Sequence, residues 1–545
     1  MAFLNVLVSL AAVSLVPLYL LVSRLVRQRS LWKVPGPEGV SLISGILTTW
    51  FGEDALEFHD KTMDRFGRIF TIPGFLGDKI VSVADTKALY DVLVKNQENF
   101  REIDGVREHT RVVIGGTGLL TALGDTHRKQ RKLMTPAFSI NHMRRLMPIF
   151  QELSRSSAAR MREEVANGPK EIDIMDYTSR LALELIARAG FGHSFGAIEG
   201  NDEGYSRALK NFSPTAAKLA NGIILLPILT RLVPGRMLRS MAEMIPWRPL
   251  HDMMLISDTM QATSRDIWEE KKRLFSLGDK SVVNEYGEGK DIMSILLKNT
   301  LASSEADERM TDDELLAQIN TFTLAASDTT SNTFSRVLHL LALHSEVQQK
   351  LREELVEASM NGEIEHDDLC ALPYLEAVIR ETLRLYPPVA YVYRQVVNDA
   401  VLPLAHPYTD TNGMERHELF VPGGGTIFIV NVAGVNRDKA IWGLDAKEWK
   451  PERWLSPLPD SVAEARIPGV YANTLTFIGG GRSCIGFKFA QLEMKTALAH
   501  LIPVFHFAPP EKEEIVWRLG SIVSPTVNGP TTRHSEMPLR VSLIV

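Results

Sequence analysis

The sequence predicts a mainly α-helical protein with a minor β-sheet (α+β), preceded by a transmembrane helix at its N-terminus. Hydrophobic residues make up 45% and charged residues 23% of the 545 residues, which is an ordinary globular composition. Long amphipathic segments with helical spacing dominate the chain from about Thr126 to Leu385. Short strand-like runs lie on either side of these segments. We expect an anchor region over residues 1–30 and a single large helical domain over residues 31–545, since no repeat or linker interrupts the chain.

The N-terminal segment from Phe3 to Val22 holds 20 residues without a charge, about the length that spans a bilayer. Basic residues follow directly, which places the rest of the chain in the cytosol. A cleaved signal peptide is the alternative, but its basic n-region is missing and the apolar run is long. The run Pro35-Gly36-Pro37 cannot continue a helix and separates the anchor from the body.

The body begins with two short strands, IFTIPGF and IVSVADT, and a third follows the turn in VPGGGTIFIVNV. The least periodic stretch, Phe275 to Lys290, reads as a surface loop. A second apolar region, Leu219 to Val233, is broken by a proline and an arginine and is too short to span a membrane. It is either a buried helix pair or a surface segment that inserts into the interface of a membrane.

The net charge of −6 gives no electrostatic case for nucleic-acid binding. The chain has two cysteines, Cys370 and Cys484, which excludes a disulfide scaffold and a four-cysteine zinc site. Cys370 is expected in a connection between helices, with a structural role.

Cys484 lies where a glycine-rich stretch becomes a helix with apolar spacing from Phe487 onward. A helix N-terminus lowers the pKa of a thiol, and Arg482 can meet an anionic group. The surrounding glycines let a flat ligand approach the backbone. A buried, inert cysteine is the plain alternative. A phosphate cradle fits poorly, because no Gly-Lys-Ser/Thr follows.

The residues Phe477, Gly480, Arg482, Cys484 and Gly486 fit the spacing Phe-x-x-Gly-x-Arg-x-Cys-x-Gly. This string resembles the haem-binding loop of the cytochrome P-450 family, the haem-thiolate monooxygenases. The resemblance implies haem b between a long central helix and the helix after the cysteine, with the Cys484 thiolate as the axial iron ligand. A thiolate ligand favours cleavage of the O–O bond.

The resemblance extends to two helical segments. Glu381 and Arg384 lie three residues apart on one helix face and match the family's Glu-x-x-Arg, with Arg453 as a third, structural partner. Ala325, Asp328 and Thr329 match the central helix, where Thr329 would hydrogen-bond oxygen at the haem and Asp328 would feed protons through water. Ala326 stands where the family usually has glycine.

Four side chains are expected to bind the carboxylates of the haem: His127, Arg131, Arg394 and Arg482. His127 and Arg131 lie four residues apart on one helical face. Arg394 matches the family's arginine that binds a haem carboxylate, which the resemblance places on a strand. The family usually has tryptophan where this chain has His127. An imidazole N–H can still donate to a carboxylate.

The resemblance implies oxidation with O2 and electrons from NADPH. The sequence holds no Gly-x-Gly-x-x-Gly after a strand and no flavin domain. A separate membrane-bound diflavin reductase, NADPH-cytochrome P-450 reductase, is therefore the expected partner, with a cytochrome b-type donor as a second one. Docking would use basic residues near the cysteine. The expected location is the endoplasmic reticulum membrane, single-pass, with the catalytic domain in the cytosol. The candidate docking residues are Arg128, Lys129, Arg131, Lys132 and Lys488.

The resemblance implies which segments line the substrate pocket, and these are mainly apolar outside the first of them, so the substrate is expected to be a hydrophobic small molecule. A terpenoid or related fungal secondary metabolite is the first choice, and fatty acids or xenobiotics come next. A reductase-independent isomerase or dehydratase and a haem sensor are the other classes. The lining segments are Ile103 to Leu120, the region after Ser206, Phe322 to Ala326, Val389 to Tyr393 and Ile522 to Val527.

Overall fold

The computed structural model describes residue 19 and residues 22–201, 204–223, 225–277, 291–302, 309–528 and 535–544. Of the predicted anchor region 1–30, residues 1–18, 20 and 21 lie outside these residues, so the apolar run Phe3 to Val22 is almost wholly undescribed. Within the described ranges, no helix is both long enough and apolar enough to cross a membrane. The chain forms two compact units. Of the described residues, unit 1 takes those up to Ile103 together with Tyr391–Ala446 and Pro459–Ser483, and unit 2 takes the others.

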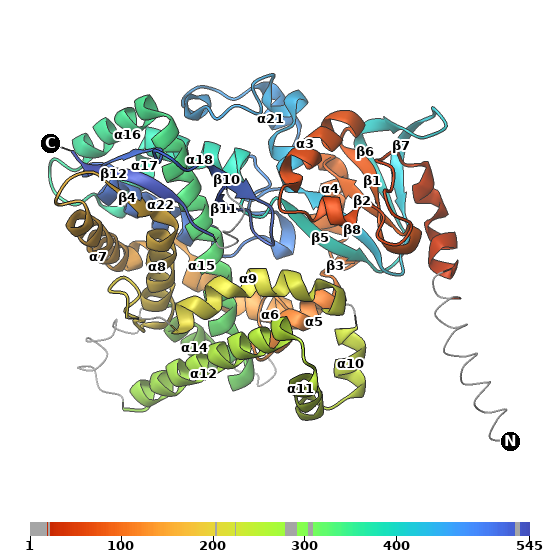
Figure 1. The fold of residues 1–545 in the computed structure, drawn as a ribbon, viewed down its shortest axis with the longest axis horizontal. Coiled ribbons are helices and arrows are strands. Elements are labelled where there is room, and N and C mark those ends of the chain that lie inside the picture. The colour runs from red at the N-terminus through yellow and green to blue at the C-terminus, as the bar shows by residue number, and fades with distance from the viewer. Residues whose placement is uncertain are drawn as a thin grey trace. The chain divides into compact units, whose positions relative to one another are not determined.

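Unit 1 is built on a mixed sheet with the strand order β1-β2-β8-β5-β3 (Figure 1). The parallel pair β2 and β8 joins segments that lie far apart in the sequence, with Val81 opposite Phe428. β8 is buried along most of its length, which confirms the buried strand expected after the glycine turn. The sheet strands are β1 (Ile69–Pro73), β2 (Lys79–Val83), β3 (Phe100–Arg101), β5 (Tyr391–Val396) and β8 (Thr426–Asn431).

Outside this sheet, unit 1 holds several helices and a two-stranded sheet of β6 and β7. Asp85 caps α4 by accepting from the backbone N–H groups of Lys87 and Ala88, and it also accepts from Ala405 on β6. One buried carboxylate therefore joins α4 to β6, which pairs with β7 in an antiparallel two-stranded sheet. These elements are α2 (Leu47–Trp50), α3 (Ala55–Phe66), α4 (Thr86–Tyr90), β6 (Ala400–Thr409), β7 (Glu415–Val421), α19 (Val432–Asn436), α20 (Lys439–Trp442), α21 (Asp460–Glu464) and the 3-10 helix Gly480–Arg482.

Unit 2 is mainly helical, as the amphipathic segments predict. Its helices are α5 (Asp104–Val113), α6 (Gly124–Met134), α7 (Ile140–Glu164), α8 (Ile174–Leu185), α9 (Gly204–Ile223), α10 (Leu226–Leu232), α11 (Gly235–Met244), α12 (Arg248–Leu277), α14 (Ile292–Ala302), α15 (Asp312–Leu343), α16 (Ser345–Ala358), α17 (His366–Ala371), α18 (Pro373–Leu385) and α22 (Phe487–Leu501). Its strands are β4 (Lys170–Asp173), β9 (Phe505–Ala508), β10 (Ile515–Arg518), β11 (Ser524–Val527) and β12 (Pro538–Leu543).

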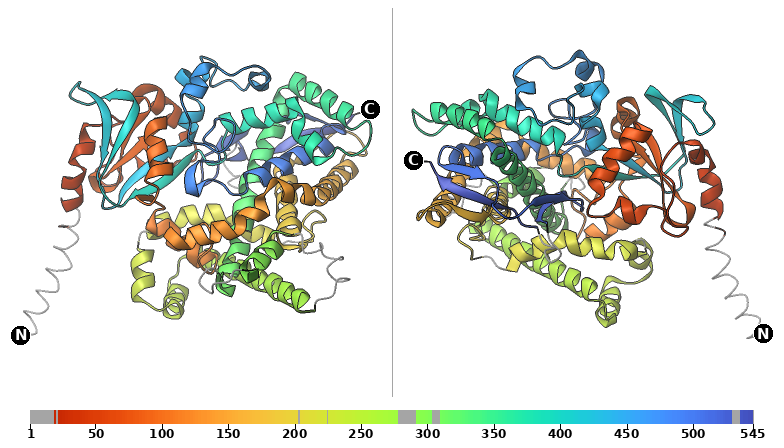
Figure 2. Two further views of the ribbon diagram at one scale, coloured as in Figure 1. Left: turned by 180° about the vertical axis from the view of Figure 1, so that it is seen from behind. Right: turned by 45° about the horizontal axis from the view of Figure 1, so that its top comes forward.

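The long helix α15 is the centre of unit 2. It starts with a capping box, in which Thr311 and Glu314 satisfy each other's backbone N–H groups, and it continues for 32 residues. Most of its residues are buried, and α8 packs along it (Figure 1). The pair α9 and α12 packs in the same unit and runs side by side in both views of Figure 2. A helix covered on so many sides gives a fixed frame for the polar side chains in its middle.

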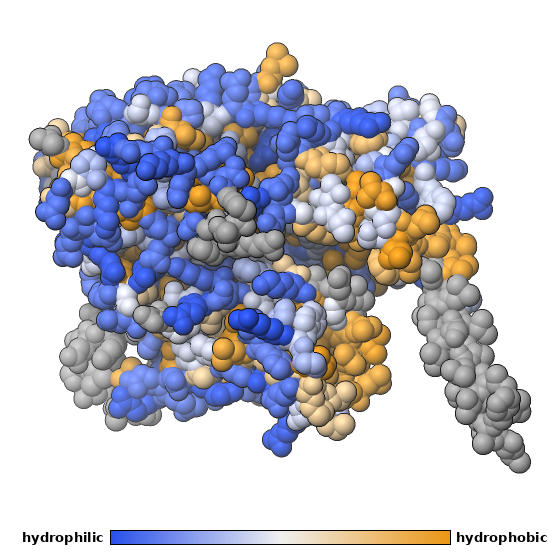
Figure 3. Space-filling view, in the orientation of Figure 1, coloured by the Kyte–Doolittle hydropathy of each residue, from blue (hydrophilic) through white to orange (hydrophobic). Residues whose placement is uncertain are grey.

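The apolar region from Leu219 to Val233 differs from a buried helix pair. It spans the end of α9 and all of α10, and α10 has no buried residue. Leu232 and Met244, on α10 and on the following helix α11, are each 75% exposed. Apolar side chains gather over α10 and α11 in Figure 3. The interpretation as a buried pair is therefore wrong for α10, because this helix contacts α5, α9 and α11 and still buries none of its residues.

Two other expectations are corrected by the structure. The predicted loop from Phe275 to Lys290 begins inside a helix, since α12 continues to Leu277, and residues 278–290 lie outside the described residues. Cys370 lies within α17 rather than in a connection, and its side chain is exposed.

Candidate active site

The middle of α15 carries an accessible stripe on an otherwise buried helix. Ala325 is exposed, and Asp328 and Thr329 are half-buried, while Thr323, Ser327 and their neighbours on the other faces are buried. The three predicted site residues of this helix therefore share one face, as their i, i+3 and i+4 spacing requires. An accessible patch halfway along a covered helix indicates an interior space beside that face.

Asp328 is held by the neighbouring helix α9. The Ser213 hydroxyl donates to its Oδ2 at 3.4 Å. Burial raises the pKa of Asp328 to about 6, while the Ser213 hydrogen bond and the charge of Lys210 oppose that rise. This carboxyl can therefore hold or release a proton close to neutral pH.

Thr329 uses its hydroxyl hydrogen within the helix. Its Oγ1 donates to the carbonyl of Ala325 at 2.7 Å. The hydroxyl oxygen keeps lone pairs that can accept a hydrogen bond from the accessible face. Thr333 and Asn332 bond the backbone in the same way, which satisfies the polar residues that are locally unfavourable in an apolar helix.

Cys484 stands just before α22 in unit 2, as the helical spacing from Phe487 predicts. Its side chain is solvent-accessible, yet burial raises the pKa of its thiol. A sulfur atom that faces an enclosed space can be accessible to small molecules and still be surrounded by protein. The expected lowering of the pKa by the helix N-terminus is wrong, because burial outweighs the opposing effects of the Gly486 N–H and the Arg131 charge.

His127 and Arg131 both lie on α6, one turn apart. His127 is buried, and Arg131 is half-buried and close enough to act on the thiol of Cys484. The structure therefore places a cation of α6 beside the cysteine in unit 2. The i, i+4 spacing predicted that His127 and Arg131 would share a face, and the helix confirms it.

In unit 1, Arg394 and Arg482 converge on one acid, Glu102. Their Nη2 atoms lie 3.8 and 3.5 Å from the two Glu102 oxygens, and Arg394 also donates to the Tyr393 carbonyl. Burial lowers the pKa of both arginines, and Glu102 opposes this. Arg394 lies on β5, the strand position that the sequence predicts.

The glycines before the cysteine serve the chain's own packing. A Cβ on Gly480 would lie 1.8 Å from the Leu93 carbonyl oxygen, and its φ of +70° is left-handed. A Cβ on Gly479 would lie 1.9 Å from the Pro468 carbonyl oxygen. These two glycines are therefore required by close contact with the protein's own backbone, and their approach to a flat ligand stays a prediction. Phe477, earlier in the same loop, packs edge-on against Tyr471.

The predicted network around Glu381 is confirmed. Glu381 and Arg384 are fully buried on α18 and paired at 2.8 Å, and the Arg453 Nε lies 3.3 Å from the same carboxylate. The Trp454 indole and the Lys450 backbone N–H also donate to it. One carboxylate thus joins α18 to the segment 447–458 of unit 2.

The predicted basic surface is partly neutralised. Arg128 pairs with Asp125, and Lys129 lies 3.3 Å from Glu314. Lys488 lies over the Phe487 ring. Lys132 is exposed.

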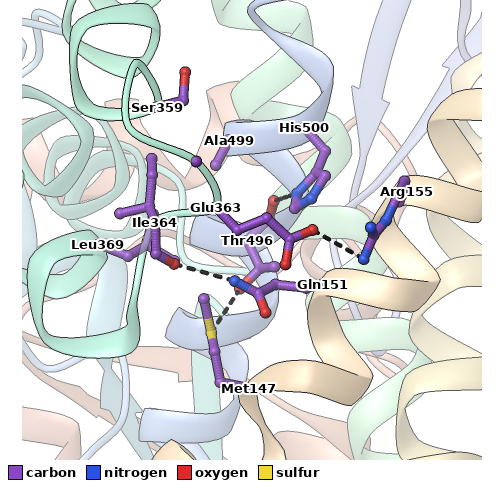
Figure 4. Close-up of a pocket in the computed structure, with 11 residues that line it drawn as sticks. Met147, Gln151, Arg155, Ser359, Glu363, Ile364, Leu369, Thr496, Ala499 and His500 are labelled. Carbon is purple, nitrogen blue, oxygen red and sulfur yellow. Dashed lines mark hydrogen bonds and ion pairs between the residues drawn. The ribbon is translucent and has the colours of Figure 1, made fainter.

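A pocket of about 240 Å³ lies elsewhere in unit 2. Figure 4 shows it between α7, the segment after α16 and the C-terminal half of α22. Its polar side chains are engaged with one another and with the backbone. Arg155 pairs with Glu363, and Gln151 donates to Ile364. Thr496 lies nine residues beyond the start of α22, about 14 Å along the helix axis. We assign no chemistry to this pocket.

Sequence reasoning missed two residues near the predicted site. Glu102 gave no signal, because its partners are almost 300 and 400 residues away in the chain. His109 on α5 is buried and stacks on Phe212 of α9. A histidine in an amphipathic segment gives no sign of whether its ring faces the core.

Known proteins resemble this chain along most of its length. A family model described as Cytochrome P450 matches residues 34–529. Cytochrome P450 monooxygenases 91 and 81 of Postia placenta are 45% and 42% identical, over 94% and 96% of this chain and 94% and 95% of their own. A ganoderic acid synthetase of Ganoderma lucidum is 40% identical over 88% of each chain.

Proposed function

The chain belongs to the cytochrome P450 family, and from this premise we propose that it is a haem-thiolate monooxygenase that hydroxylates a hydrophobic small molecule. The observation that carries the proposal is the accessible thiol of Cys484 in an otherwise enclosed setting, within the string Phe-x-x-Gly-x-Arg-x-Cys-x-Gly. The catalytic domain would be residues 31–545.

The residues fit haem b by the chemistry of their donors. The Cys484 sulfur would hold the iron, and the Gly486 N–H that favours its thiolate form would temper its electron donation. Arg394, Arg482 and, on α6, His127 and Arg131 would bind the haem carboxylates, because guanidinium and imidazole N–H groups suit such acceptors. Bound haem supplies the oxygen-activating and redox chemistry.

The side chains of α15 would handle protons. A carboxyl with a pKa of about 6 is partly protonated near neutral pH, so Asp328 can pass a proton to water and take one back. The Thr329 oxygen, free to accept while its hydrogen is donated to Ala325, would hold that water in place. The small, exposed side chain of Ala325, on the same helix face as Asp328 and Thr329, would leave room for this water. Ala326 narrows this face by one methyl group relative to glycine.

The substrate class that we propose is terpenoid or a related fungal metabolite. Support comes from the ganoderic acid synthetase, which is 40% identical to this chain, and from the apolar cluster beside α15. Its buried members include Leu209, Met253 and Met260, and Phe212 and Leu324 are partly exposed at its edge. An apolar wall of this kind suits a hydrophobic skeleton.

Electrons would come from NADPH through a separate diflavin reductase, with a cytochrome b-type donor as a second source. Lys132 and the neighbouring basic residues of α6 would steer an acidic partner. The salt dependence of reduction by this reductase tests the assignment, since added salt should slow an electrostatically steered encounter.

We also propose attachment to the endoplasmic reticulum membrane through the segment Phe3 to Val22, with the catalytic domain in the cytosol. The exposed apolar face of α10 and α11 supports a second contact with the lipid surface. Flotation of the full chain with phospholipid vesicles tests membrane attachment.

The two cysteines give a matched test of the central proposal. We expect Cys484→Ala to abolish the thiolate spectrum of the reduced, carbon monoxide-bound protein and to stop NADPH-dependent product formation. Cys370→Ala, at an exposed position on α17, should change neither. A thiolate spectrum that survives in Cys484→Ala would show that the iron ligand is assigned wrongly.

A further inference from the structure

His109 is a polar side chain in a position that packing alone does not explain. It lies on α5 with 8% of its surface exposed, and its Nε2 is buried with no hydrogen-bond partner among the described residues. Its ring stacks on Phe212 of α9, with centroids 6.2 Å apart and planes 28° apart. A phenylalanine would stack equally well without the cost of an unpaired buried nitrogen.

The surroundings of His109 connect it to the proposed catalytic acid. Helix α5 packs beside α9 in unit 2 (Figure 1). Phe212, which carries the stack, is a partly buried member of the apolar cluster that also includes Leu324 of α15. The next residue, Ser213, donates to Asp328. His109 therefore lies at the α5 side of the same apolar wall that reaches Asp328.

The charge around His109 favours recognition of a neutral group. Glu108 pairs with Arg111 at 2.6 Å and Arg107 lies 3.7 Å from Asp104, so the charged neighbours on α5 are paired with one another. Burial lowers the pKa of His109 to about 4, which leaves the imidazole neutral at pH 7. A neutral imidazole offers one donor and one acceptor. A hydroxyl group is the small group that matches both roles without bringing a charge into an apolar site.

We propose that His109 determines specificity by hydrogen-bonding the hydroxyl group of an apolar alcohol, so that the substrate class is hydrophobic alcohols, terpenoid alcohols among them, rather than hydrocarbons. This inference rests on the proposed monooxygenase function. It places the hydroxyl-bearing end of the substrate against α5 and α9. The oxidised carbon then lies on another part of the skeleton, and the product carries a second oxygen.

The test compares an alcohol with its deoxy analogue on the full-length holoprotein, using cholesterol against 5-cholestene. Dissociation constants are measured from the Soret shift and, independently, from the ligand-dependent rise in the melting temperature. His109→Phe keeps the ring contact with Phe212 and loses both imidazole nitrogens. We expect this variant to lower the ratio of the hydrocarbon dissociation constant to the alcohol dissociation constant about tenfold. His109→Gln, whose amide both donates and accepts, should restore part of the ratio.

His251→Phe, at an exposed position on α12, is the matched control and should keep the wild-type ratio. His109→Leu is the second variant if His109→Phe fails to fold, and it should lose the ratio in the same way. An equal ratio in wild type and His109→Phe would overturn the inference. Failure of every probe to bind a wild-type protein with an intact thiolate spectrum would overturn it too, while leaving the haem-thiolate proposal in place. A thiolate spectrum that persists in Cys484→Ala would instead contradict the proposed function itself.

Discussion

Replacement of Glu381 by glutamine removes the carboxylate that two buried guanidinium groups share. Glu381 accepts from Arg384 through two bonds of 2.8 Å, from Arg453 at 3.3 Å and from Trp454 at 3.0 Å. Glutamine keeps the shape of the side chain, but it turns an N–H group toward these donors. Removal of one partner from a buried ion pair costs about 3–5 kcal/mol, because the remaining charge stays in a poorly solvated place. We expect a loss of that size in the free energy of unfolding.

The assay is urea unfolding followed by tryptophan fluorescence, with the loss taken from the shift in midpoint at unchanged slope. Glu57→Gln is the matched control, because Glu57 also pairs within one helix, with Lys61, but both of those side chains are largely exposed. We expect the control to unfold almost as wild type does, since solvent screens such a pair. A loss below about 1 kcal/mol for Glu381→Gln, or one equal to that of the control, would refute the assignment of this network as a buried brace.

Two further predictions concern Asp328 and the loop before the cysteine. The pKa of Asp328 is raised to about 6 from an ordinary value of 3.8, so the folded protein binds this proton more tightly than the unfolded chain does. Relative to Asp328→Asn, the wild type should therefore lose stability as the pH rises from about 4 to about 6, with a constant difference above that range. Melting temperatures of both proteins across this pH range check the direction of the change. A wild type that becomes more stable relative to Asp328→Asn as the pH rises would contradict the prediction. Gly480→Ala should destabilise the protein strongly and reduce its haem content, because the new Cβ meets the Leu93 carbonyl. Gly413→Ala separates the causes, since Gly413 has a φ of +80° and open space around it; equal losses in the two variants would show that the positive φ alone is responsible.

The sequence was sufficient where a local pattern determines the outcome. The spacing of Glu381 and Arg384 places them on one helix face, and the apolar character of that segment indicates burial, which the structure confirms. The shared face of Ala325, Asp328 and Thr329 follows in the same way from helical spacing. Such features depend on residues within one or two turns of a helix.

Features that depend on distant parts of the chain were not predictable. The thiol pKa of Cys484 follows the amount of protein around it, which a helix-terminus argument does not contain. The need for glycine at position 480 comes from a carbonyl almost 390 residues earlier, at Leu93. The exposure of α10 was also undetermined, because apolar periodicity shows that a face is hydrophobic and says nothing of what covers it.

The order in which the segments of unit 1 are made has a consequence for synthesis in the cell. Its first segment ends at Ile103, but β2 pairs in parallel with β8, which begins only at Thr426. At about 5–20 residues per second, a ribosome would need tens of seconds to make the intervening chain. For that time the β1–β2 hairpin would present an unpaired strand edge, a known template for aggregation. Nascent chains of this protein should therefore depend on chaperones until β8 emerges, and a variant that slows translation between these segments should lower the soluble yield without altering the folded enzyme.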